Sequence, residues 1–83
     1  MYEQELEIPS TNKLEKTKNS EWKQRRGEDI DTHWYDELNT LNEIINKYII
    51  EDITSTYPPF KKTSRWQRFD KNNNLIEERF KRF

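Results

Sequence analysis

The predicted fold depends most on residues 34–53, WYDELNTLNEIINKYIIEDI. The large apolar side chains of this stretch recur at alternating spacings of four and three residues, as they do along one face of an α-helix. They are Trp34, Leu38, Leu41, Ile45 and Tyr48. Asp31 is a suitable N-cap, and Pro58 with Pro59 prevents a helix from continuing. We therefore predict an amphipathic helix over about residues 32–53.

The apolar face of this predicted helix is broad and needs cover, which the C-terminal segment can provide. Residues 65–70 and 75–80 would form a β-hairpin around the turn 71–74, whose asparagines tolerate the left-handed conformation of tight loops. Alternatively, Asn74 caps a short helix with Glu77 at its third position. We favour the hairpin because two strands cover a wide helix face better than a short terminal helix does.

The N-terminal third is poorer in apolar residues. Alternation over residues 2–8 predicts an edge strand that ends before Pro9. Residues 10–29 hold only Leu14 and Trp22 as large anchors, which predicts a flexible basic arm. The expected organisation is an arm over 1–29 and a helix-plus-hairpin domain over 30–83. The fold class is α+β, with one central helix packed on a small antiparallel hairpin or meander; the alternative is mostly α, with two helices.

Composition narrows the class of protein. The chain has 83 residues, of which 30% are hydrophobic and 37% charged, so its core must be small. It has no cysteine, which excludes disulfides and thiolate metal sites and favours a cytoplasmic setting. The acidic start lacks the features of a signal peptide, and the longest apolar run, residues 48–50, is too short to span a membrane. The lack of Ala and Val beside many Asn, Lys and Ile fits an AT-rich source, such as some bacteria or their phages.

No catalytic pattern is present in the sequence. His33 is the only histidine and Gly27 the only glycine, so a zinc site built on several histidines and a glycine-rich phosphate loop are both excluded. We predict a protein that is not an enzyme and has no metal or other cofactor.

Charge and aromatic residues are distributed unevenly. Residues 28–60 carry eight acids and one lysine, whereas residues 10–27 and 61–83 are basic. Bases alternate with aromatic rings in the basic segments, as at interface hot spots. The predicted partner-binding residues are Trp22, Arg25, Arg26, Arg65, Trp66, Arg68, Phe80 and Arg82. The competing interpretation is that the aromatic side chains of the tail form the core.

These features predict a non-catalytic regulator, inhibitor or accessory subunit that docks on a larger protein or protein complex. The alternative is a nucleic-acid-binding module that uses the basic arm 13–26 and the tail 65–83. The acidic block 28–60 opposes that alternative because it would repel phosphate. A homodimer is a further expectation, since a second copy could cover the broad apolar face.

Overall fold

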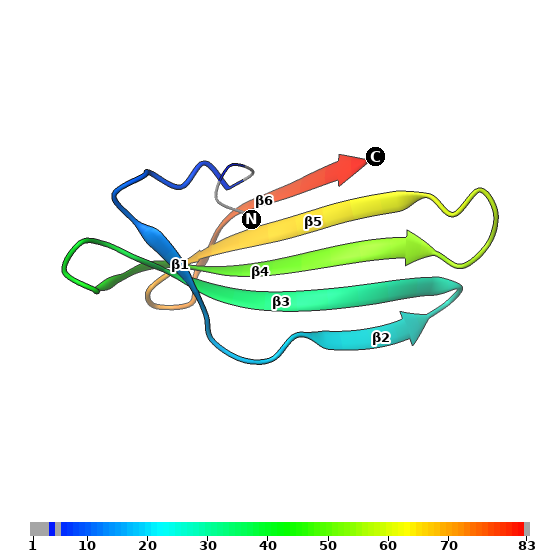
Figure 1. Cartoon of the computed structure of the whole chain (residues 1–83), viewed down its shortest axis with the longest axis horizontal. Helices are drawn as coiled ribbons and strands as arrows, with labels where there is room; N and C mark the ends of the chain where they lie inside the picture. Colours follow the sequence, from blue (N-terminus) through cyan, green and yellow to red (C-terminus); the bar gives the residue numbers. More distant parts are fainter. Residues whose placement is uncertain (1–3, 5, 83) are drawn as a thin grey trace.

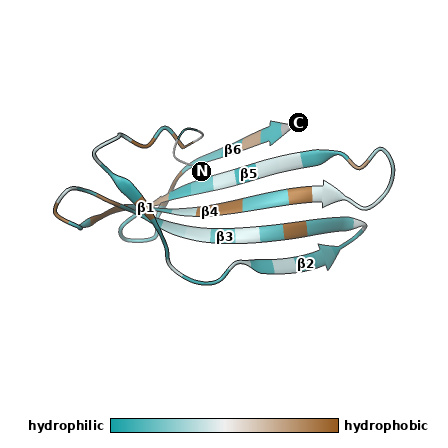
Figure 2. Cartoon of the chain, viewed as in Figure 1, coloured by the Kyte–Doolittle hydropathy of each residue, from teal (hydrophilic) through white to brown (hydrophobic). Residues whose placement is uncertain are grey.

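The protein is a single antiparallel β-sheet with no helix among the residues that its computed structural model describes, which are residue 4 and residues 6–82 (Figure 1). The six strands are β1 (Lys13–Lys16), β2 (Glu21–Arg25), β3 (Glu28–Leu38), β4 (Ile44–Ser55), β5 (Lys62–Asp70) and β6 (Leu75–Arg82). Strands β3 to β6 lie side by side in chain order, while β1 and β2 both pair with the other edge of β3. The hydrophobic positions concentrate on β4, and β2 is largely hydrophilic (Figure 2).

The predicted central helix over residues 32–53 is wrong, and so are the α+β class and the mostly-α alternative. These residues form most of β3 and β4, which pair along their whole length and reverse at residues 39–43. Asn39 builds this turn, because its side-chain oxygen accepts hydrogen bonds from the backbone N–H groups of Leu41 (2.9 Å) and Glu43 (3.0 Å). Asn42 adopts a φ of 61°, in the left-handed region that asparagine tolerates. The turn thus breaks the periodic stretch in its middle.

The predicted C-terminal hairpin is present, and the alternative helix beginning at Asn74 is not. Strands β5 and β6 pair antiparallel from Thr63 to Phe69. In the turn, Asn73 has a φ of 69°, and the Asp70 carboxylate accepts hydrogen bonds from the backbone N–H groups of Asn72 (2.8 Å) and Asn74 (2.9 Å). The backbone hydrogen bond from Asn74 is the main cause of the lowered pKa of Asp70.

The basic segment 10–29 supplies β1 and β2, and the proposed boundary at residues 29 and 30 lies inside β3. A two-residue turn at Arg26 (φ 48°) and Gly27 (φ 77°) joins β2 to β3, as in a type I′ hairpin. A side chain at Gly27 would also collide with the Tyr57 ring. Of the strand predicted over 2–8, residues 4, 6 and 7 form turns and Ile8 is not in a strand; residues 1–3 and 5 lie outside the described part.

One face of the sheet carries the hydrophobic core and is called the covered face. Residues opposite one another in register share a face, which places Tyr48, Ile50 and Trp66 together on β4 and β5. Leu6, from the segment before β1, packs against them, and all four side chains are at most 8% exposed. The N-terminal segment therefore covers the part of this face that carries the core cluster.

A polar network lies at one end of this core. The carboxylate of Glu37, which is 4% exposed, accepts hydrogen bonds from Tyr48 Oη and Asn12 Nδ2, both at 2.7 Å. The Arg68 guanidinium donates to Tyr48 Oη (3.1 Å), to Glu77 (2.8 Å) and to the backbone carbonyl of Leu6 (2.9 Å). Burial, together with the hydrogen bond to Glu37, raises the pKa of Tyr48 to about 12. The network ties β3, β4, β5 and β6 to the N-terminal segment.

The molecule buries little of its surface for its size. Its accessible surface is 6198 Å², against about 5,400 Å² for a typical monomer of this mass. Its radius of gyration is 13.9 Å, against about 12 Å for a compact chain of this length. The described part contains no helix long and apolar enough to cross a membrane.

Candidate binding face

The second face of the sheet is called the open face and is centred on Trp34, Ile49 and Phe69. Trp34 of β3 lies opposite Ile49 of β4, and Phe69 of β5 lies opposite Lys47 of β4. Further large apolar side chains share this face by register: Ile30, Ile53, Leu75 and Phe80. Among the described strands, every contact between elements is between neighbours in the sheet, so no strand packs over this face.

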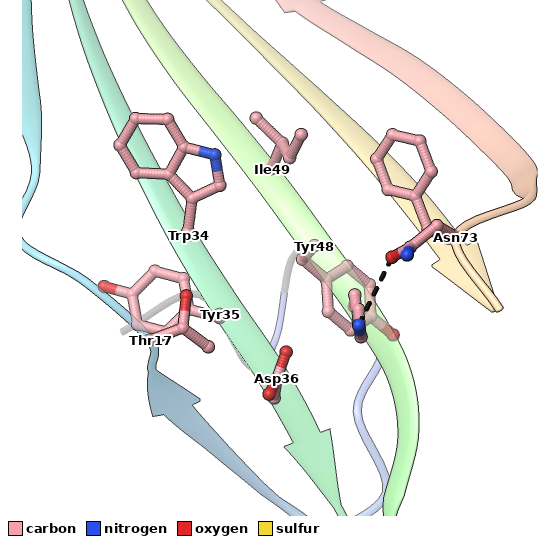
Figure 3. Close-up of a pocket in the computed structure, with 9 residues that line it drawn as sticks. Thr17, Trp34, Tyr35, Asp36, Tyr48, Ile49 and Asn73 are labelled. Carbon is pink, nitrogen blue, oxygen red and sulfur yellow. Dashed lines mark hydrogen bonds between the residues drawn. The ribbon is translucent and has the colours of Figure 1, made fainter. Parts of the chain in front are cut away.

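A hollow of about 460 Å³ lies on the open face between β3, β4 and the β5–β6 turn (Figure 3). Trp34, Ile49 and Phe69 provide its apolar lining. Its polar lining includes Thr17, Asp36, Lys47 and Asn73. An apolar floor with a few polar groups at the rim is the usual composition of a site that binds a ligand or an anchoring side chain.

Lys47 lines this hollow and Lys18 lies beside it, and neither makes an ion pair with a described carboxylate. The Lys18 ammonium lies 3.8 Å from the centroid of the Trp34 ring, a cation–π contact. Lys47 Nζ donates a hydrogen bond to Asn73 Oδ1 at 3.2 Å. Asp36 faces Lys47 in register, yet its pKa is raised because burial outweighs the attraction of Lys47. The hollow therefore combines apolar surface with cations that a carboxylate could still bind.

The structure separates the partner-binding residues that the sequence predicts. Trp22, which is 61% exposed, lies on β2, and Arg25 and Arg26 lie at the β2–β3 turn. At the other edge of the sheet, Arg65 and Phe80 lie opposite each other on the open face. The backbone of Arg82 on β6 pairs with Thr63 on β5. The side chain of Arg82 is outside the described part of the structure. The two basic segments thus occupy opposite edges of the sheet.

Two of the predicted residues, Trp66 and Arg68, belong to the covered face. Trp66 is 8% exposed and packs edge-on against Tyr48, with 6.3 Å between ring centroids. Arg68 lies over both rings and is bonded within the core. On the open face, Arg65 forms an ion pair with Glu51. Part of the charge segregation in the sequence is therefore used in pairing neighbouring strands.

The sequence did not predict that Trp34, Lys47, Ile49 and Phe69 lie together. The predicted helix over residues 32–53 contains only the first three. Along β3, no alternation of apolar and polar residues was evident, because its covered face also carries polar side chains such as Asp31 and His33. The frequent β-branched residues of β4 were the available signal for a strand.

A contact between Ser20, His33 and Asp52 was also not predicted from the sequence. Ser20 Oγ lies 2.5 Å from His33 Nδ1, and His33 Nε2 lies 3.3 Å from Asp52 Oδ2. A serine hydrolase triad joins the same three residue types but with the two histidine nitrogens exchanged. Ser20 is also exposed, and the Asp52 side chain is 42% exposed. Solvent weakens the electrostatic stabilisation on which such a triad depends. We interpret the contact as one that fixes the β1–β2 connection to β3 and β4.

Comparisons of the chain with protein-family models, with curated proteins and with solved structures find no match. Among the described residues, no group of three or more His, Asp or Glu side chains is arranged to hold a metal ion. The open face is therefore the best-defined candidate for function.

Proposed function

We propose that the protein is a non-catalytic, cytoplasmic binding module that docks on a larger protein through its open face, as a regulator, inhibitor or accessory subunit. The observation that carries this proposal is the group of Trp34, Ile49 and Phe69 on three neighbouring strands, with no described strand packed over it. A sheet usually buries a face of this kind against a second layer. A partner protein would provide that layer.

The unburied surface has the size that such docking requires. The protein exposes roughly 800 Å² more than a typical monomer of its mass, and one partner of a standard protein complex buries about 800 Å². Tryptophan is also among the residues that contribute most to the stability of protein interfaces. An interface of this size would bring the buried area of the chain close to that of an ordinary domain.

Charge favours a protein partner over nucleic acid. The rows that cross the open face mix both signs, with Asp36 beside Lys47 and Glu51 beside Arg65. The strongly basic segments lie at the two edges of the sheet and are separated by β3 and β4, which carry most of the acidic block. A phosphate backbone binds best along a continuous basic stripe. The open face offers no such stripe among its described side chains.

Replacing Trp34 with alanine is expected to weaken partner binding about 30-fold or more, the effect of losing a central hot-spot residue. Trp22→Ala is the matched control, because Trp22 is 61% exposed and lies on the β2 edge. The tagged protein would capture its partner from nuclease-treated lysate of the cells that encode it, and the affinity of the purified pair would then be measured for both variants. Equal loss in both variants, or loss only in Trp22→Ala, would contradict docking through the open face.

Two other outcomes would replace the proposal. Capture from untreated lysate that is lost after nuclease treatment would support the nucleic-acid alternative, as would affinity for an oligonucleotide that falls steeply with salt. Sedimentation over a concentration series would reveal a homodimer, and a dimer abolished by Trp34→Ala would show that a second copy covers the open face.

A further inference from the structure

The hollow on the open face has two properties that together specify a ligand. Its volume of about 460 Å³ lies within the range of about 300–1,000 Å³ found for small-molecule sites. Its apolar lining comes from Trp34, Ile49 and Phe69, and two of these are aromatic. Aromatic rings pair favourably in offset or edge-to-face arrangements, so this lining suits a planar aromatic group.

The second property of the hollow is its positive charge, which favours an anionic ligand. Lys47 lines the hollow and Lys18 lies over the ring of Trp34, and neither lies within ion-pair distance of a described carboxylate. The contacts that they make are with the Trp34 ring and with the neutral amide of Asn73. A carboxylate would make a stronger, charge-assisted hydrogen bond with either ammonium group. Asp36, the acid in the lining, acts in the opposite direction, but Lys47 lies directly opposite it and offsets its charge.

We propose that the hollow is a recognition pocket for an aromatic group that carries a carboxylate. In the docked complex this ligand is an aromatic side chain of the partner protein with an acidic residue beside it. The aromatic ring fills the space between Trp34 and Phe69, and the carboxylate binds Lys47 or Lys18. This inference rests on the proposed function, since it names the chemistry that the partner presents to the open face.

The test uses two small probes that share one ring and differ in charge. The full chain, labelled with ¹⁵N, is titrated with indole-3-acetate and separately with tryptamine, to about 10 mM because single side-chain fragments bind weakly. Indole-3-acetate should produce saturable shifts of the Trp34 indole N–H and the Asn73 side-chain amide. Its affinity should exceed that of tryptamine at least tenfold, because the cationic probe meets two lysines.

Lys47→Met should reduce this preference to about threefold or less, since only Lys18 remains to favour the anion. Lys23→Met, an exposed lysine on β2, is the control and should leave the preference unchanged. Equal affinity for both probes, shifts away from the hollow, or no saturable binding would overturn the inference. Docking that depends on Trp34 would then still stand, because the capture experiment measures it separately.

Discussion

Replacing Trp66 with alanine is expected to remove a large part of the unfolding free energy of the protein at 25 °C. Trp66 is 8% exposed and belongs to the small cluster with Leu6, Tyr48 and Ile50. Deleting a buried tryptophan side chain costs about 3–5 kcal/mol of unfolding free energy. A chain of this length has a total of about 4–12 kcal/mol at typical values per residue, and its small core places it in the lower half. Urea denaturation followed by far-ultraviolet circular dichroism would measure the loss.

Trp22→Ala is the control for this prediction, because Trp22 is 61% exposed. Its unfolding free energy should stay within about 0.5 kcal/mol of the parent value. If Trp66→Ala instead folded as stably as Trp22→Ala, Trp66 would be a surface residue, as the sequence-based prediction of partner binding requires, and the covered face would be assigned incorrectly.

The second large effect is expected for Arg68→Ala, which should lower the unfolding free energy by about 3 kcal/mol. The Arg68 guanidinium bonds Glu77, Tyr48 and the carbonyl of Leu6, and its side chain is 23% exposed. Removing one member of a buried ion pair costs about 3–5 kcal/mol, and the partial exposure of Arg68 places it at the lower end. The same denaturation experiment measures this loss.

Arg79→Ala provides a matched comparison because Arg79 binds the same carboxylate. Arg79 Nε lies 2.7 Å from Glu77 Oε2, but its side chain is 61% exposed. Its loss should therefore cost less than about 1 kcal/mol, as at other surface ion pairs. Similar losses for the two arginines would mean that Arg68 does not tie the N-terminal segment to the sheet.

The error in the predicted fold has a physical cause in residues 34–53. Leu38 and Leu41 supply two positions of the apparent helical stripe, yet Leu38 ends β3 and Leu41 lies within the turn that the Asn39 side chain stabilises. Trp34 and Tyr48 supply two others, yet they lie on opposite faces of the sheet. The spacing of a helix therefore arose from two strands and a loop. Turn chemistry at Asn39 and Asn42 was the local signal that competed with periodicity.

The C-terminal hairpin was predictable because its turn is specified locally. The Asp70 carboxylate accepts its hydrogen bonds from Asn72 and Asn74 within the turn, and Asn73 adopts the left-handed conformation. The binding face was not predictable in the same way, since Trp34, Ile49 and Phe69 come from three strands. Their grouping depends on the β3–β4 and β4–β5 registers, which one sequence does not define.

The covered face carries the core cluster beneath the N-terminal segment, whereas no described strand packs over the open face, where we propose that a partner docks. Ile49 and Ile50 are neighbours on β4 that point to opposite faces, and Ile50 is 1% exposed. Relaxation of their methyl resonances by a soluble gadolinium chelate measures the access of solvent to each face. We predict that the Ile49 methyl groups relax several times faster than those of Ile50. Equal protection of both residues would contradict the claim, because it would show that the face with Trp34 is already covered.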